Sequence, residues 1–348
     1  MNTPWLRGTN SLAVVIVGSL CAALIGGGGM IGCSSSSSSS PSARMQTPKG
    51  VDRYVQAVHA YQSGNRDRAV DRLLAATRAN PDLIMARVML GDLYRESGDY
   101  AGAMNQYEAL IKRDPYSWSN HYKLGVTYQF LDRLKDALAS YERALKLNPD
   151  DANTNMNLGL VYLYLERPDD AVRYTERATL LDPRSAPAFS NLGVALDARG
   201  DFARAETAYR HSLDLDPDNV TTLLNLGTNL LAQGKNAEAV DIMQRVVQAD
   251  DTPSHRKRLG DALAKSGRFD EAVQQYQGVL AADPRYYPAL NEIGFTRIAE
   301  YRKNLELDDS KRNEALAMWD KSLAINPDQP QIQAAKQQWS GRTELFRK

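Results

Sequence analysis

The chain has 348 residues, with 42 lysines and arginines against 42 aspartates and glutamates, so its formal net charge at pH 7 is zero. This balance gives no support to a nucleic-acid partner, which favours a clearly basic face. The only two cysteines are Cys21 and Cys33, so a structural disulfide or a cysteine-rich metal site is excluded from the rest of the chain.

Residues 1–32 have the pattern of a signal peptide. Arg7 gives a short basic start, and residues 12–31 are apolar and mostly small. The glycine run at 26–29 disfavours a long membrane-spanning helix, so we expect export with cleavage. An uncleaved anchor helix is the alternative reading of the same residues.

The four residues Met30-Ile31-Gly32-Cys33 resemble the lipobox of bacterial lipoproteins, with methionine where leucine is usual. The resemblance implies that Cys33 becomes an acylated N-terminus, and that Ser34 directs the protein to the outer membrane. Residues 33–48 begin with this cysteine and a serine run, a composition that has nothing to bury. We therefore expect a lipidated flexible tether and a periplasm-facing lipoprotein of the bacterial cell envelope.

One unit then recurs, and residues 152–183 contain a full copy of it. Two runs with apolar residues at helical spacing are separated by Glu166, Arg167 and Pro168. Pro168 fits the first turn of a second helix, where its missing N–H costs nothing. The small residues Gly159 and Ala171 lack bulk at the point where the two helices would cross. Each unit is therefore predicted to be an antiparallel helical hairpin.

Three positions of this unit recur along the chain, mostly at intervals of 34 residues. The small residue of the first helix falls at Ala57, Gly91, Gly125, Gly159, Gly193, Gly227, Gly260 and Gly294; the alanine of the second helix at Ala69, Ala103, Ala137, Ala171, Ala205, Ala239, Ala272 and Ala315; and the closing proline at Pro81, Pro115, Pro149, Pro183, Pro217, Pro284 and Pro327. This pattern resembles the tetratricopeptide repeat (TPR). The resemblance implies an all-α fold, a right-handed α-α superhelix of eight repeats over residues 49–329 with a C-terminal capping helix over residues 330–348.

Repeats four to six each carry an asparagine two residues before the packing glycine, at Asn157, Asn191 and Asn225. An amide offers both a donor and an acceptor, so a stack of three could pair with the backbone of an extended peptide. The arrangement resembles the asparagine ladder of the TPR superhelix in O-linked N-acetylglucosamine transferases. Bonds from these amides to neighbouring repeats are the alternative.

The same face of the first helices supplies the remaining lining of a predicted concave groove. We expect Tyr122, Phe130, Tyr164 and Lys257 to take part in peptide binding, since mixed aromatic and charged linings suit protein partners. Packing of Phe130 and Tyr164 on the neighbouring repeat is the alternative. In the eighth repeat, nine residues are inserted between glycine and alanine; we expect residues 298–305 to lengthen the first helix by about two turns.

No catalytic or metal-binding pattern stands out, because the four histidines fall in different repeats without a paired motif. We predict no enzymatic activity, no metal and no cofactor. The sequence favours a noncatalytic scaffold that holds a protein or extended peptide and reaches the membrane through an N-terminal lipid anchor. The alternative is a pilotin-like structural factor that docks through outer ridges during assembly of a pilus, a secretion system or another envelope complex.

Overall fold

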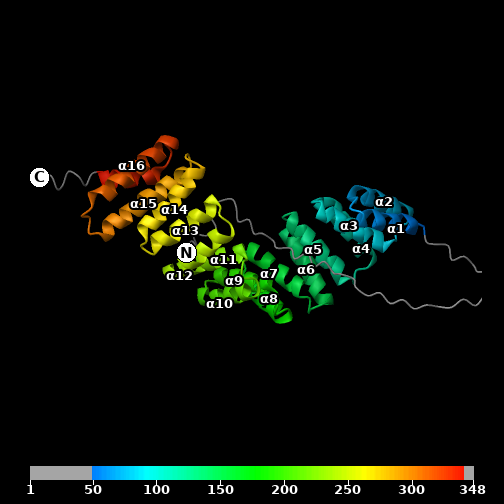
Figure 1. Ribbon diagram of the computed structural model, residues 1–348. Helices are drawn as coiled ribbons and strands as arrows, with labels where there is room; N and C mark the ends of the chain where they lie inside the picture. The colour runs from blue at the N-terminus through cyan, green and yellow to red at the C-terminus, as the bar shows by residue number, and fades with distance from the viewer. Residues whose placement is uncertain (1–48, 341–348) are drawn as a thin grey trace, which may run out of the picture. The chain divides into compact units, whose positions relative to one another are not determined.

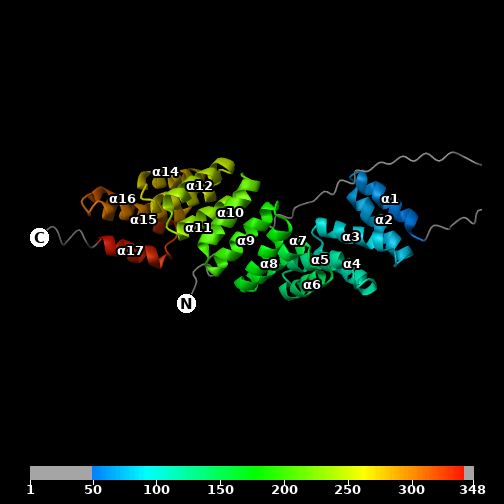
Figure 2. The same ribbon diagram turned by 90° about the horizontal axis from the view of Figure 1, so that it is seen from below.

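The computed structural model describes residues 49–340, and these form 17 α-helices with no strand among them (Figures 1 and 2). The predicted all-α class is confirmed. The predicted signal peptide, Cys33, the tether and residues 341–348 lie outside the described residues. The chain divides into two compact units between Val161 and Tyr162, within α7. We call residues 49–161 the N-terminal unit and residues 162–340 the C-terminal unit.

The N-terminal unit is built of helical hairpins in chain order. Its helices are α1 (Val51–Gln62), α2 (Arg66–Ala79), α3 (Ile84–Glu96), α4 (Tyr100–Arg113), α5 (Trp118–Phe130), α6 (Leu134–Leu147) and the greater part of α7 (Ala152–Tyr164). From α1 to α6, each helix packs against the next. Odd-numbered helices are the first helices of the repeats and even-numbered helices the second, as the sequence predicted.

The C-terminal unit continues the same alternation. Its helices are α8 (Pro168–Leu181), α9 (Ala186–Arg199), α10 (Phe202–Leu215), α11 (Val220–Ala232), α12 (Asn236–Ala249), α13 (Pro253–Lys265), α14 (Phe269–Ala282), α15 (Tyr287–Lys303), α16 (Asp309–Ile325) and α17 (Pro330–Ser340). Each packs against the next, and the first helices α9 and α11 also contact each other. Pro168 begins α8, as its missing N–H predicts.

The recurring glycines make room for a side chain of the second helix. A Cβ atom built on Gly193 would lie 2.4 Å from Cε1 of Tyr209, a ring that is 1% exposed. Gly125 and Gly260 face tyrosine rings in the same way, and Gly294 faces Trp319. Small size is therefore needed opposite a bulky ring, which is more specific than the helix crossing expected from the sequence.

The eighth repeat departs from the others because its nine inserted residues are divided among three places. Helix α15 has 17 residues against 13 in α13, and α16 has 17 against 14 in α14. The two remaining residues lengthen the connection 304–308. The first helix thus gains about one turn, rather than the two that we expected. Asp308 caps α16 by accepting from the Ser310 amide at 3.0 Å.

Candidate functional site

Asn191 on α9 and Asn225 on α11 lie half-buried on adjacent first helices of the C-terminal unit. Each is followed by a buried leucine that packs into the core, so the amide is held at the edge of that core. Thr222 Oγ1 donates to Ser190 Oγ at 2.9 Å and ties the two helices together beside the amides. Neither of the two asparagine side chains has a hydrogen-bond partner among residues 49–340. Both side-chain amides therefore offer a donor and an acceptor to a ligand.

Asn157 behaves differently, because its side chain is engaged inside the N-terminal unit. Its Nδ2 donates to the hydroxyl of Tyr122 at 3.3 Å, and the Tyr122 ring lies 6.0 Å from that of Tyr141. Burial, followed by the nearby Asp151 carboxylate, raises the pKa of Tyr122. The structure therefore brings together two of the predicted peptide-binding residues, Asn157 and Tyr122, as partners of each other.

The two other predicted aromatic residues are partly exposed. Phe130 is 41% exposed, and its ring stacks on Tyr100 of the preceding repeat with centroids 4.5 Å apart and an interplanar angle of 3°. One face of Phe130 is therefore covered by its neighbour, which is the packing alternative recognised in the sequence. Tyr164, at the end of α7, is 46% exposed.

Lys257 on α13 is held by carboxylates. Its Nζ lies 2.9 Å from Asp261 and 3.6 Å from Glu292. Burial alone would lower its pKa, but these two carboxylates raise it. The charge of Lys257 is thus compensated within the C-terminal unit, and this leaves less of it for a partner than the sequence led us to expect.

Arg258 occupies the asparagine position in the seventh repeat, and sequence reasoning missed it as a binding residue. It follows Asn225 by 33 residues because the sixth repeat is one residue short. The side chain is exposed and forms no ion pair with any residue that the structure describes. Asn191, Asn225 and Arg258 together, which we call the polar row, present two amides and a guanidinium from successive first helices of one unit.

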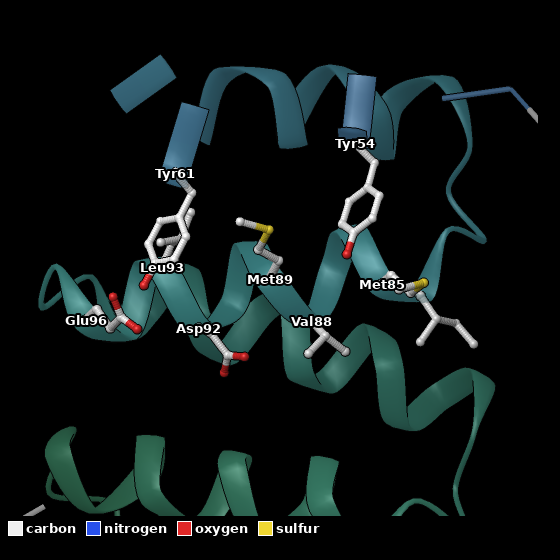
Figure 3. A pocket seen from close by; sticks show the side chains of 9 residues that line it. Tyr54, Tyr61, Met85, Val88, Met89, Asp92, Leu93 and Glu96 are labelled. Carbon is white, nitrogen blue, oxygen red and sulfur yellow. The ribbon is translucent and has the colours of Figure 1, made fainter. Parts of the chain in front are cut away.

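A second feature is a pocket of about 380 Å³ between α1 and α3 in the N-terminal unit (Figure 3). Tyr54 and Tyr61 point from α1 toward the side chains of α3. Its lining residues are Tyr54, Tyr61, Ile84, Met85, Val88, Met89, Asp92, Leu93 and Glu96. The sequence signal for it was present in two tyrosines seven residues apart and two methionines four apart, spacings that place each pair on one helix face.

Both carboxylates in this lining are compensated from outside it. Lys123 Nζ lies 2.6 Å from Asp92, and an Arg66 nitrogen lies 3.3 Å from Glu96. The hydroxyl of Tyr107 also donates to Asp92 at 2.7 Å. The pocket is thus an apolar hollow with little net charge, suited to an apolar side chain.

Tyrosine hydroxyls hold carboxylates on first helices in the C-terminal unit as well. Tyr209 donates to Asp197 and Tyr276 to Asp261, each at 2.8 Å. Burial raises the pKa of Asp197, and burial with the adjoining carboxylate raises the pKa of both tyrosines.

Within residues 49–340, no group of three His, Cys, Asp or Glu side chains could hold a metal ion. In the same range, no helix is both long and apolar enough to cross a membrane.

Comparisons with known proteins identify the family of these repeats. A family model described as tetratricopeptide repeat matches residues 54–117, 156–220 and 224–287, and a second, described as TPR repeat, matches 131–165. No curated protein matches the sequence.

Similar solved structures include two TPR proteins and a pilus biogenesis factor. One from Parabacteroides merdae is 17% identical, with 71% of this chain and 98% of that chain covered and a TM-score of 0.55. PilW, a type IV pilus biogenesis factor, is 22% identical, with 58% and 94% covered and a TM-score of 0.54. YrrB, a TPR protein with an unusual peptide-binding site, is 25% identical, with 57% and 97% covered and a TM-score of 0.48. The family models match more than half of the residues, and the chain therefore belongs to the tetratricopeptide repeat family.

Proposed function

We propose that this chain is a noncatalytic scaffold that binds an extended peptide segment of a partner protein along the polar row. Proteins of the TPR family are generally protein-interaction scaffolds, which supports the general class. The observation that carries the proposal is the pair of unpartnered amides, Asn191 and Asn225, on adjacent helices tied together at Thr222 and Ser190.

The spacing of the polar row suits a peptide backbone. Adjacent packed helices lie roughly 8–10 Å apart, and an extended chain advances about 3.3 Å per residue. Successive side chains of the row would therefore meet about every third peptide residue, and each amide can pair with one N–H and one C=O irrespective of sequence. Arg258 adds a cation that favours an acidic side chain at the third contact.

The proposal extends to where the scaffold acts. The lipobox-like residues ending at Cys33 support a lipid anchor, and the serine-rich stretch that follows supports a tether to the bacterial envelope. In this proposal the repeats hold their partner on the periplasmic side of the outer membrane. This part of the proposal depends on the sequence, because residues 1–48 lie outside those that the structure describes.

The test replaces both amides, Asn191→Ala with Asn225→Ala, in the full chain. Partners are first identified by cross-linking in the native envelope and mass spectrometry, and the affinity of synthetic peptides from them is then measured by fluorescence anisotropy. Loss of up to four backbone hydrogen bonds should weaken binding roughly tenfold or more. Gln248→Ala, which removes an exposed amide from a second helix, is the matched control and should leave the affinity unchanged.

An unchanged affinity in the double variant would reject the polar row as the binding site. The assembly-factor alternative is favoured by one observation, the exposed leucines in the connection of the eighth repeat. Deleting residues 302–311 separates the two functions. If the chain is a peptide-binding scaffold, the affinity for the peptide should be unchanged by this deletion. If the chain docks through an outer ridge, the deletion should abolish binding of the partner.

A further inference from the structure

Leu305 and Leu307 project from the connection between α15 and α16, and we call them the leucine tip. They are 79% and 81% exposed, more than any other large apolar residue that the structure describes. Burial of a leucine side chain is favourable. Two leucines that are separated by one residue and both exposed to water therefore indicate a surface that a partner covers.

The leucine tip has a fixed shape. Leu305 and Glu306 both adopt left-handed backbone conformations, with φ of 58° and 57°. Hairpin turns elsewhere in the described residues use one such residue at a time, usually a glycine, as at Gly200 with φ of 88°. Strain of this kind persists only where the surrounding structure imposes it.

Backbone hydrogen bonds from Leu305 to Arg302 at 3.1 Å and from Glu306 to Tyr301 at 2.9 Å hold that shape, and ion pairs join the helices on either side of the connection. Arg297 on α15, whose side chain is 9% exposed, lies 2.6 Å from Asp270 on α14 and 2.9 Å from Glu314 on α16. Glu300 joins the cluster, at 2.7 Å from Arg297 and 3.1 Å from Lys311. Three helices of the C-terminal unit are therefore fastened together beneath the leucine tip.

The pocket between α1 and α3 provides a surface of matching chemistry. Ile84 and Met85 at its edge are 48% and 62% exposed, and tyrosine and methionine side chains form much of its wall. Methionine is flexible and polarizable, so it adapts to the shape of an inserted apolar group. A volume of about 380 Å³ lies within the range of pockets that bury small ligands, and it is sufficient for branched side chains.

Both surfaces are electrically neutral, which narrows the choice of partner. Residues 302–311 contain three basic and three acidic side chains. The pocket's two carboxylates are compensated by Lys123 and Arg66. Neither surface favours a strongly charged partner such as an anionic membrane, and neither repels the other.

We propose that the leucine tip of one copy of this chain inserts into the α1–α3 pocket of a second copy. The contact joins two different surfaces, so it is heterologous and each copy can both offer a tip and accept one. Because each copy carries one tip and one pocket, the contact can either continue along a chain of copies or be made twice within a reciprocal pair.

The test uses two tagged forms of the full chain, co-expressed and captured through one tag. The tip variant carries Leu305→Asp and Leu307→Asp, and the pocket variant carries Met85→Asp. All three sites are exposed, and aspartate is favourable in the first turn of α3, so the fold should persist and circular dichroism checks it. Leu180→Asp on α8, at a leucine that is 72% exposed, is the matched control.

Two wild-type forms and two Leu180→Asp forms should co-purify. Two tip variants, or two pocket variants, should lose at least roughly tenfold in co-capture. A tip variant paired with a pocket variant should co-purify as well as wild type, because one intact contact remains, and light scattering should show only 1:1 dimers. Failure of wild-type forms to co-purify, undiminished capture between two tip variants, or loss of capture in the mixed pair would each overturn the proposal.

Discussion

The contact between Gly193 and Tyr209 gives the sharpest test of how each hairpin is packed. In Gly193→Ala, the new Cβ would lie 2.4, 2.6 and 2.8 Å from three carbons of the Tyr209 ring. The ring is 1% exposed and its hydroxyl is bonded to Asp197 at 2.8 Å, so it cannot swing into solvent. Helices α9 and α10 must therefore move apart by a sizeable fraction of an ångström.

The magnitude follows from two opposing terms. Overpacking of a well-filled core costs about 1–3 kcal/mol, whereas alanine in place of glycine inside a helix contributes about 1 kcal/mol of stability. Gly278 in α14 isolates the second term, because a Cβ there would come no closer than 3.3 Å to the end of the flexible Arg256 side chain. Gly278→Ala should thus stabilise by about 1 kcal/mol, and Gly193→Ala should fall about 1–3 kcal/mol below it.

Urea denaturation and hydrogen exchange of the amides in α9 and α10 measure the effect, since a repeat array can open locally. Adding Tyr209→Leu removes the clash. In that background Gly193→Ala should change sign and become stabilising, which gives a coupling of about 1–3 kcal/mol in the double-mutant cycle. If Gly193→Ala stabilises as much as Gly278→Ala, or has the same effect with and without Tyr209, the packing argument is refuted.

Two further predictions concern charge and processing. Burial alone would raise the pKa of Glu206, but hydrogen bonds from Lys235 and two neighbours lower it from 4.5 to about 2, so its stabilisation is full above pH 4.5 and is lost as pH falls toward 2. Urea midpoints of Glu206→Gln should therefore decline less than wild type over this range, and parallel declines would contradict the assignment. Blocking the lipoprotein signal peptidase should retard the wild-type chain on electrophoresis but leave Cys33→Ser unaffected; an unshifted wild type would exclude acylation.

Local signals in the sequence were sufficient to predict the hairpins. The helical spacing of the apolar residues in each unit and the proline at the start of α8 each act within one or two turns of their own position. The length of α15 was predicted wrongly because the chain leaves the helix at Asn304 and turns through Leu305 and Glu306 in left-handed conformations. Near this end of α15, Arg297 and Glu300 form ion pairs with residues of α14 and α16. Those ion pairs connect residues far apart in sequence, and no periodic pattern contains them.

The candidate site was predictable only as a register of positions. The recurrence places Asn157, Asn191 and Asn225 at equivalent points, and it also places Arg258 there once the short sixth repeat is counted. It does not reveal that the hydroxyl of Tyr122 accepts from Asn157, because that contact spans 35 residues and depends on which side chain the preceding repeat supplies. Whether an amide is free for a ligand is decided by its neighbour.

The tyrosines of the second helices show why register alone cannot assign these roles. Tyr107 and Tyr276 donate to Asp92 and Asp261, which directly follow the packing glycine, whereas Tyr209 donates to Asp197, four residues after it. Both acceptor positions lie on the same face of the first helix, since residues three apart are neighbours there. A hydroxyl held at a fixed place thus bonds to a carboxylate from either turn. Equivalent positions in successive repeats therefore have different partners according to the side chains that neighbouring helices supply: Asn157 donates to Tyr122 on α5, whereas the side chains of Asn191 and Asn225 have no partner among residues 49–340.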